Sequence, residues 1–380
     1  MTSLAARAGG VLSINLRALQ QNYLIVRHQV SPAECAASVK ADAYGLGMDQ
    51  VAPALQAAGC RTFFVALPEE GKRLRAILPD AKIYILGGLL LGEAGFYAAH
   101  RLQPVLGQPE EIEEWAQWCK REGRRLPAGL HVETGINRLG LEVDQVRAVA
   151  GKPTVFSSFE PSLVLSHLAK ADEPDDPLNE LQRQRFDMLR SLLPAMPASL
   201  ANSAGAFLPR EFHLDLVRPG IGLYGGNPFL GRANPFKPVV RLDGKVLQVK
   251  RVGAGDTVGY GGSWRAGRAS LIAVVAAGYA DGYFRACSFP GSADQAKVAV
   301  CGHSAPVVGR VSMDMITVDV TDVPEQAIVR GSMVELFGET ISVDDLARWS
   351  GSIAYEVLTR LGSRYPRLYS AFDSSPKVPS

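Results

Sequence analysis

The sequence has little of what marks a disulfide-stapled or metal-binding protein. Its 380 residues include only five cysteines, which are widely spaced and form no C-x-x-C pair. Such a set favours neither a disulfide framework nor a zinc site, and it is typical of a protein from a reducing compartment. We therefore expect no metal ion and a cytoplasmic location.

Long apolar runs and an excess of one charge are also missing. The longest apolar stretches, around 83–91 and 271–277, are too short to span a bilayer. The first residues, MTSLAARAGG, hold no apolar segment of the kind found in secretory signal peptides. With a formal net charge of only +2, binding to nucleic acid or to a membrane surface is not expected.

What the chain does contain is enough apolar material for more than one core. Apolar residues make up 47% and charged residues 21%, the balance of a globular protein, and the length suggests two or three domains. Up to about residue 233, short apolar runs alternate with amphipathic segments. The candidate strands are 35–40, 62–66, 82–86, 103–106, 129–133, 163–167, 199–201 and 214–217. The candidate helices include 48–58, 109–121, 143–150 and 178–193. This alternation favours a (β/α)8 TIM-type barrel, with a doubly wound open sheet as the alternative.

The pattern changes after a stretch rich in Gly, Pro and Asn at 225–238, which we interpret as a linker. Strand-like runs dominate beyond it, at 239–252, 270–276, 297–300, 305–311, 316–320 and 333–337. One helix is expected after Ser342, a residue type that caps helices. The predicted fold is therefore α/β, with a barrel over residues 1–233 followed by a mostly β C-terminal domain over 234–380.

Polar residues follow the ends of the predicted barrel strands, where barrel enzymes carry their functional groups. These positions hold Lys40, Arg138, His167, Ser203, Arg218, Gly220 and Ile221. A lysine at a strand end is as readily a solvated side chain as a nucleophile, but partial desolvation would lower its pKa and favour Schiff-base chemistry. A serine hydroxyl with backbone amides suits a phosphate, and an arginine suits an unprotonated pyridine nitrogen. Each residue type therefore fits pyridoxal 5'-phosphate (PLP).

Four segments resemble, in the same order, motifs of the alanine racemase family. They are SVKADAYGLG (38–47), SHLAKADE (166–173), ANSAG (201–205) and LVRPGIGLYG (216–225). The resemblance implies PLP attached to Lys40, with Tyr44, Ser203, Gly220 and Ile221 at the phosphate, His167 against the pyridine ring and Arg218 at the pyridine nitrogen. The family commonly has Asn and His where this chain has Asp42 and Leu46.

A fifth segment, HVETGINRLG (131–140), departs from the family at one position. The resemblance directs Arg138 at the phenolic oxygen of PLP and at the substrate carboxylate. Many members orient this arginine with a carbamylated lysine, and the matching residue here is His131. Because an imidazole cannot form a stable carbamate, Arg138 must be positioned otherwise, by Glu133, by an anion or by packing.

Racemisation requires two acid/base groups, one on each face of the inverted carbon. Lys40 can serve one face. A candidate for the other is Tyr260 in the segment VGYGG (258–262), although a tyrosine flanked by glycines is more typical of a turn. The segment resembles the catalytic tyrosine motif of the family, in which this residue enters the active site of the partner subunit. The resemblance therefore implies a homodimer.

Three further segments of the β half resemble family motifs: AAGYADGYFR (276–285), GRVSMDM (309–315) and IAYEVLTR (353–360). They imply Tyr279, Arg285, Arg310 and Asp314 at the substrate entrance, Met313 at the substrate carboxylate and Tyr355 at the phosphate. The alternative for Arg285, Arg310 and Asp314 is a surface ion-pair network.

The resemblance implies a PLP-dependent enzyme that interconverts L-alanine and D-alanine. A racemase of broader specificity, acting on serine or basic amino acids, would use the same residues. PLP-dependent amino-acid decarboxylases share the barrel-plus-β architecture. A non-catalytic PLP-binding carrier is a barrel alone, whereas this chain is expected to have a second domain that carries Tyr260 and Tyr355.

Overall fold

The computed structural model describes residues 3–288, 294–324 and 328–373, and the chain forms two compact units. The first, here called the barrel unit, comprises residues 19–223 and 227–236 with the chain end from 372. The second, the β unit, comprises the chain up to residue 18 with 224–226 and 237–371.

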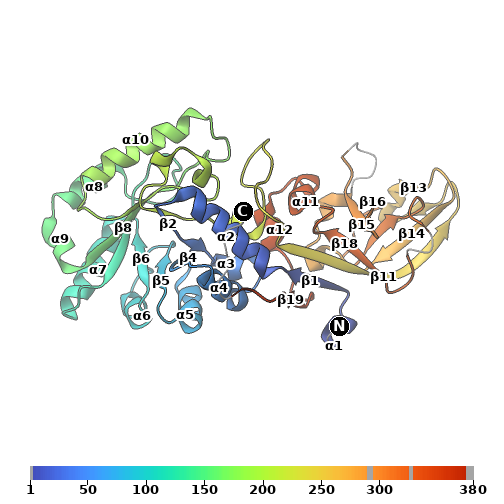
Figure 1. Ribbon diagram of the computed structural model, residues 1–380, viewed down its shortest axis with the longest axis horizontal. Helices are drawn as coiled ribbons and strands as arrows, with labels where there is room; N and C mark the ends of the chain where they lie inside the picture. Colours follow the sequence, from blue (N-terminus) through green and yellow to red (C-terminus); the bar gives the residue numbers. More distant parts are fainter. Residues whose placement is uncertain (1–2, 289–293, 325–327, 374–380) are drawn as a thin grey trace. The chain divides into compact units, whose positions relative to one another are not determined.

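The barrel unit contains a parallel sheet of seven strands and a further parallel pair of strands, with helices beside them (Figure 1). Its strands are β2 (Glu34–Cys35), β3 (Ala37–Ser38), β4 (Thr62–Val65), β5 (Lys82–Ile85), β6 (Gln103–Leu106), β7 (Pro127–His131), β8 (Glu160–Leu165), β9 (Ala198–Ser199) and β10 (Leu216–Val217). Strands β3 to β9 pair in chain order, and β10 pairs with β2. The amide of Arg218 donates to the carbonyl of Ala201 at 2.9 Å, which joins the β10 end to the β9 end. The predicted (β/α)8 barrel is confirmed.

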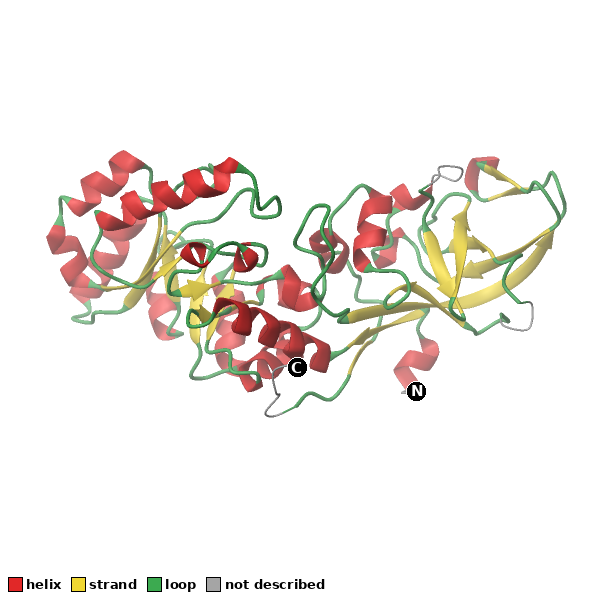
Figure 2. Ribbon diagram, turned by 45° about the horizontal axis from the view of Figure 1, so that its top comes forward, coloured by secondary structure: helices red, strands yellow, loops and turns green. Residues whose placement is uncertain are grey.

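Helices surround the strands of the barrel unit (Figure 2). They are α2 (Leu16–Val30), α4 (Met48–Ala57), α5 (Pro68–Ile77), α6 (Ala94–Ala99), α7 (Pro109–Arg121), α8 (Val143–Ala150), α9 (Pro153–Ser158) and α10 (Pro177–Ser191). The element α3 (Lys40–Tyr44) is a left-handed turn, and the 3₁₀ turns are η1 (Gly205–Phe207), η2 (Arg210–Phe212) and η3 (Ile221–Tyr224). Pro109 and Pro177 occupy first turns, where a missing N–H costs nothing. The Asp176 carboxylate accepts from the Leu178 amide at 2.8 Å and caps α10.

Alternating residues of the barrel strands fill its interior. Ala36, Phe64, Tyr84, Val105, Leu163, Leu165 and Leu216 form one buried cluster. The Phe64 and Tyr84 rings stack with centroids 5.1 Å apart. This core fixes the strand ends, from which the functional side chains project.

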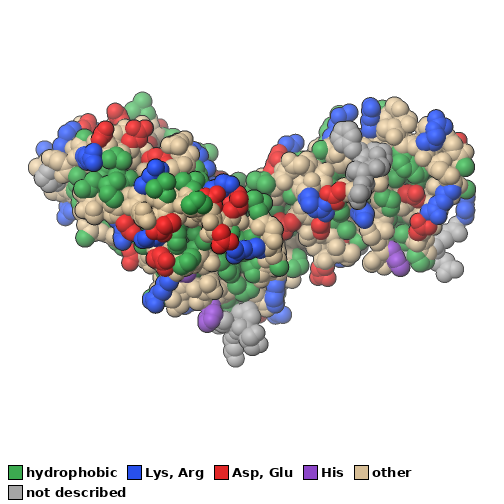
Figure 3. Space-filling model, turned by 90° about the horizontal axis from the view of Figure 1, so that it is seen from above, with side chains coloured by type: hydrophobic (Ala, Val, Ile, Leu, Met, Phe, Trp, Pro, Cys, Tyr) green, Lys and Arg blue, Asp and Glu red, His purple; other side chains and the backbone are tan. Residues whose placement is uncertain are grey.

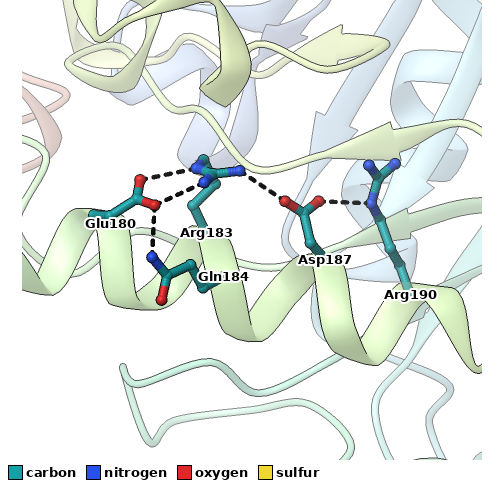
Figure 4. Close-up of polar contacts among 5 residues, drawn as sticks. All are labelled: Glu180, Arg183, Gln184, Asp187 and Arg190. Carbon is teal, nitrogen blue, oxygen red and sulfur yellow. Dashed lines mark hydrogen bonds and ion pairs between the residues drawn. The ribbon is translucent and has the colours of Figure 1, made fainter.

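Charges on the outer side of α10 are explained by the helix itself. Arg183 bonds both Glu180 and Asp187, and Arg190 bonds Asp187 (Figure 4). Such pairs, three or four residues apart, each stabilise a helix by about 0.2–0.5 kcal/mol. The opposite side of α10 buries Phe186. These pairs within the helix account for the charges of all four side chains.

The β unit is built on a sheet in the order β14-β17-β16-β15-β18-β11-β1-β19, with β14 also paired to β11. Its strands are β1 (Gly10–Ile14), β11 (Val240–Val252), β14 (Ser270–Val275), β15 (Lys297–Val300), β16 (His303–Val308), β17 (Ile316–Asp319), β18 (Met333–Phe337) and β19 (Arg367–Tyr369), with the hairpin β12 (Thr257–Val258) and β13 (Trp264–Arg265). Its helical elements are α1 (Ser3–Arg7), α11 (Val343–Ser350), α12 (Ala354–Thr359), η4 (Tyr260–Gly262), η5 (Tyr279–Asp281) and η6 (Arg285–Ser288). The expected mostly β character is confirmed. So is the expected cap, because the Ser342 hydroxyl accepts from the Asp345 amide at 3.0 Å.

Strand β1 joins this sheet from the start of the chain, between β11 and β19. Gly10 permits the close approach, since a Cβ there would lie 2.5 Å from the Asp243 carbonyl and 2.7 Å from the Tyr365 ring. A single chain position therefore does not separate the two units.

Within the described residues, every helix is too short or too polar to cross a bilayer. The same residues contain no group of three His, Cys, Asp or Glu side chains able to hold a metal ion. Acidic and basic side chains are interspersed on the face shown in Figure 3.

Candidate functional site

Lys40 stands at the end of β3, where the chain enters a left-handed turn. The four residues after it, 41–44, all have φ between 51° and 57°, and Gly45 follows at 81°. None of the four is glycine, and a left-handed conformation costs about 1–2 kcal/mol for each such residue. The turn closes a backbone bond of its own, from the Gly45 amide to the Ala41 carbonyl at 2.8 Å, and contacts from elsewhere in the fold must offset the rest of this cost.

The Lys40 ammonium lies in an environment that favours loss of its proton. Burial lowers its pKa, the Arg138 charge lowers it further, and the Glu70 carboxylate opposes both effects. A lowered pKa increases the fraction of neutral amine, which is the form able to attack a carbonyl or accept a proton.

A cradle for an anion lies beside this turn. The Ser203 hydroxyl accepts from the amides of Gly220 at 2.8 Å and Gly222 at 3.2 Å, which leaves its own O–H able to donate. A Cβ on Gly220 would lie 2.2 Å from the Tyr44 hydroxyl oxygen, so only glycine fits there. Burial raises the pKa of Tyr44 to about 12 against the lowering effect of its hydrogen bond with Ser38, so the phenol stays protonated at neutral pH. With Ile221 opening η3, the donors suit a phosphate.

Arg218 is buried and held by neutral groups. Its Nη1 donates to the Ser199 hydroxyl and its Nη2 to the Ser166 carbonyl, both at 2.5 Å. Within the described residues no carboxylate forms an ion pair with it. Burial lowers its pKa to about 10, so the guanidinium remains cationic at neutral pH. An un-neutralised arginine fits a pyridine nitrogen that must stay unprotonated, because two adjacent cations repel.

Two histidines of the barrel are neutral at pH 7. Burial, followed by the charges of Arg218, Arg138 and Lys40, lowers the pKa of His167 to about 3. Burial and the same two arginines lower the pKa of His131 to about 4. The charges of Lys40, Arg138 and Arg218 all act on His167, and Arg218 also bonds the carbonyl of Ser166, the residue before it, so these side chains lie in one region of the barrel unit.

His131 and Arg138 line a cavity of about 260 Å³. Other lining residues include Leu86, Gly107, Glu111 and Gly140. The His131 Nε2 atom is buried without a hydrogen-bond partner among the described residues. The Glu133 carboxylate accepts from the Gly135 amide and so serves its own turn. One alternative for positioning Arg138 is a contact with the Glu133 carboxylate. The structure shows no hydrogen bond or ion pair between these two described residues.

In the β unit, Tyr260 opens a turn that packs on Arg310. The turn lies in the β12–β13 hairpin, and the Tyr260 side chain is 72% exposed. Gly259 has φ 79°, and a Cβ there would lie 3.0 Å from the Arg310 amide nitrogen. A Cβ on Gly261 would lie 3.3 Å from Nη1 of the same arginine. The structure thus places the two glycines that flank Tyr260 against Arg310.

Two more of the predicted residues, Tyr279 and Met313, lie on segments that are hydrogen-bonded to each other through their backbones. The Tyr279 amide donates to the Ser312 carbonyl at 3.1 Å, and the Ala280 amide donates to the Met313 carbonyl at 3.0 Å. Both side chains are exposed, Tyr279 by 42% and Met313 by 53%.

The surface-network alternative holds for Asp314 only. Arg364 bridges it to Asp281, with Nη2 at 2.7 Å from Asp314 and Nε at 2.6 Å from Asp281. Arg285 and Arg310 form no ion pair with any described residue. Tyr355 stands in α12 with 39% of its surface exposed.

Sequence reasoning missed three groups that hold the site together. Ser199 and the Ser166 carbonyl fix Arg218, and Glu70 binds the turn after Lys40. Ser166 was within a recognised motif, and Glu70 occupies the third helical position after Leu67, where a capping glutamate is typical.

These features define a class: a (β/α)8 barrel that presents a partly desolvated lysine, a phosphate cradle and an un-neutralised arginine, joined to a β domain. The donors and the lysine fit PLP. Comparison with known proteins narrows the class. The family model for the alanine racemase N-terminal domain matches residues 14–228, and that for the alanine racemase C-terminal domain matches 239–369. The chain belongs to the alanine racemase family.

Individual relatives agree over nearly the whole chain. Alanine racemase of Rhodospirillum rubrum is 49% identical over 365 residues, which is 96% of each chain. Alanine racemase of Methylobacterium nodulans is 48% identical and covers 95% of this chain and 96% of its own. The crystal structure of alanine racemase from Bartonella henselae, with covalently bound pyridoxal phosphate, superposes with a TM-score of 0.90 at 40% identity and covers 96% of this chain and 100% of its own.

Proposed function

We propose that this chain is a PLP-dependent racemase that interconverts L-alanine and D-alanine. Membership of the alanine racemase family supports the reaction, and the bound cofactor of the Bartonella henselae relative supports PLP. The observation that carries the proposal is the convergence of Lys40, with its lowered pKa, on Arg138, His167 and Arg218. When bound through Lys40, PLP would withdraw electrons from an amino acid's α-carbon and acidify its proton.

The barrel residues would hold and tune this cofactor. Ser203 and Tyr44 would donate their hydroxyl hydrogens to the phosphate, joined by the backbone at Gly220 and Ile221 and by Tyr355 of α12. Neutral His167 would stack on the pyridine ring. Arg218 would keep the ring nitrogen unprotonated, which weakens electron withdrawal and favours proton return over side reactions such as transamination.

Two residues would move the proton. Lys40 would remove or return it on one face of the α-carbon, and Tyr260 of the partner subunit would act on the other. Because Tyr260 is exposed in this chain, its side chain is accessible to the active site of a second copy. We therefore propose an obligate homodimer. Arg138 and the Met313 backbone would receive the substrate carboxylate, and Tyr279, Arg285, Arg310 and Asp314 would line the entrance.

Two other functions compete with this proposal. The matched C-terminal domain weighs against a PLP carrier made of a barrel alone. A racemase of broader specificity would keep every residue named above. We also propose a cytoplasmic location, supported by the five cysteines, none of which forms a disulfide.

The test is conversion of L-alanine to D-alanine by the purified protein with PLP, run beside L-serine and L-lysine. We expect activity dominated by alanine that disappears in Lys40→Ala. Equal turnover of serine or lysine would favour broad specificity. Bound PLP without racemisation of any of the three would contradict the proposal and favour a decarboxylase or a carrier.

A further inference from the structure

Ala41 and Ala43 lie in the left-handed turn after Lys40 and have no polar side chain that could stabilise this conformation by a local hydrogen bond. Contacts from other segments are therefore important for the turn. Ala41 is the residue next to Lys40, and its amide donates to Oε1 of Glu70 at 2.6 Å. A bond at this position fixes the peptide that leaves Lys40. It therefore bears directly on where the lysine side chain can point.

The other oxygen of the same carboxylate binds the neighbouring strand end. Oε2 of Glu70 accepts from the amides of Ala66 at 2.8 Å and Leu67 at 3.2 Å, immediately after β4. The bond to Leu67 is the ordinary cap of α5. The bond to Ala41 is not needed for that cap. One carboxylate thus ties the Lys40 turn to the next βα loop of the barrel.

A second contact with the turn after Lys40 comes from Arg73, one helical turn further along α5. Arg73 donates to Asp42 at 2.8 Å and to Asp49 at 2.8 Å, and Asp42 also accepts from the Met48 amide at 2.9 Å. These side chains are 44–57% exposed, so water competes with the pairs and their individual effect is small. Glu70 is half-buried, and its bonds are charge-assisted bonds to backbone amides.

We propose that Glu70 is a positioning residue for Lys40, acting through the Ala41 amide and through its negative charge beside the ammonium. The inference rests on the proposed function and deepens it. Its charge opposes the effects of burial and of Arg138 on Lys40, so the lysine can hold a proton as well as release one. A base that must also return the proton requires this balance.

If the role of Glu70 were purely structural, a different result would be expected. Loss of the α5 cap alone would lower the unfolding temperature without altering Lys40. Glu69 provides the matched control, since it lies in the same helical turn and its carboxylate is 72% exposed, 3.5 Å from Lys72. Glu70→Gln removes the charge and one acceptor, whereas Glu70→Asp keeps the charge and a capping group but shortens the reach to Ala41.

The experiment compares the full-length wild type, Glu70→Gln, Glu70→Asp and Glu69→Gln. The first readout is kcat and KM for L-alanine in the PLP-loaded enzyme. The second needs no cofactor: the rate at which an amine-acetylating reagent labels Lys40 is followed against pH by mass spectrometry, with exposed Lys82 as the internal reference. The third is the unfolding temperature.

We expect Glu70→Gln to lower kcat by roughly 10- to 100-fold, with KM changed by less than about threefold, as loss of a charge-assisted hydrogen bond implies. Its Lys40 labelling profile should move to lower pH. Glu70→Asp should lower kcat with an unfolding temperature close to that of the wild type, and it serves as the test if Glu70→Gln does not fold. Glu69→Gln should match the wild type throughout.

If both Glu70 variants have the kcat and the Lys40 labelling profile of the wild type, the inference is wrong and Glu70 is a helix cap alone. Failure of the wild type to racemise alanine would overturn the proposed function instead. In that case the labelling profile still decides the role of Glu70, because it reports Lys40 without the cofactor.

Discussion

The predicted site residues of the two units differ in how the chain holds them. In the barrel unit, Arg218, Ser203 and Tyr44 are 6%, 2% and 5% exposed. In the β unit, Tyr260 and Met313 are 72% and 53% exposed. Buried polar groups need partners, and the barrel supplies them from its own strands and loops. Exposed large apolar side chains are typical of surfaces that another molecule covers. In the barrel unit the fold itself buries and holds Arg218, Ser203 and Tyr44, whereas Tyr260 and Met313 of the β unit are exposed, as the proposed homodimer requires.

The largest loss of activity is expected from Tyr260→Phe, which tests the exposed side of this comparison. Loss of the phenolic proton should reduce kcat for alanine by about 10²–10⁴-fold, the usual contribution of an acid/base group. Because Tyr260 is exposed on the β unit, the unfolding temperature and PLP retention should not change. Steady-state kinetics and absorbance after dialysis check this. An active variant would remove Tyr260 from the mechanism.

A second large effect should come from Gly220→Ala on the buried side of the comparison. The new Cβ would lie 2.2 Å from the Tyr44 hydroxyl oxygen and push a phosphate donor away. We expect PLP affinity to fall by roughly 10- to 100-fold, as loss of a hydrogen bond to a charged group implies. Titration of the stripped protein with PLP measures it. Gly95→Ala is the control, because a Cβ there meets only Trp118 Nε1 at 3.7 Å. Equal affinities in the two variants would contradict the cradle.

Preorganisation also predicts a pH dependence of stability. The pKa of His131 is about 4 and that of His167 about 3 in the folded chain, against about 6.5 when unfolded. Below pH 6.5 the unfolded chain binds protons that the folded chain excludes, so stability is present above pH 6.5 and lost as pH falls towards 4. Each histidine should cost about 2 kcal/mol by pH 5. Urea unfolding of the PLP-free protein at pH 7 and 5 measures the loss.

The variants His131→Gln and His167→Gln should each remove part of this loss, whereas His28→Gln, at an exposed position, should not. A pH dependence unchanged in both barrel variants would show that these histidines are not the source.

The smallest effect should come from a surface charge outside both sets of site residues. Asp187→Asn on α10 breaks contacts to Arg183 and Arg190 (Figure 4). Partly exposed helix pairs of this kind are worth about 0.5 kcal/mol each, so stability should fall slightly and kcat should stay unchanged. Calorimetry and the alanine assay measure both. A marked loss of activity would extend the functional site beyond the strand ends.

Regular elements with strong local signals were predictable from the sequence. The expected bounds of α7 and α8 agree with the structure, since Pro109 marks the start of one and apolar periodicity marks the other. Strand β1 was not predicted, because its partner β11 lies more than 200 residues away and only the folded sheet reveals the pairing. The same non-local pairing explains why the chain start joins the β unit.

The positions of the candidate site residues could be predicted from the sequence, but the contacts that hold these residues could not. Barrel geometry places functional residues at strand ends, so Lys40, His167 and Arg218 followed from the strand pattern. The left-handed turn after Lys40 could not be read from alanines, which give no signal for positive φ. Nor could the bond from Glu70 to Ala41 be foreseen, because it joins residues 29 apart in sequence.

The central claim is that one subunit's Lys40 works with the partner subunit's Tyr260, and mixing two inactive variants tests it most directly. Lys40→Ala and Tyr260→Phe are each dissociated, mixed in equal amounts and reassociated. Random pairing makes half the dimers mixed, each with one intact site, so about a quarter of wild-type activity should return. If the mixture contains mixed dimers and remains inactive, both residues act within one chain and the account is contradicted.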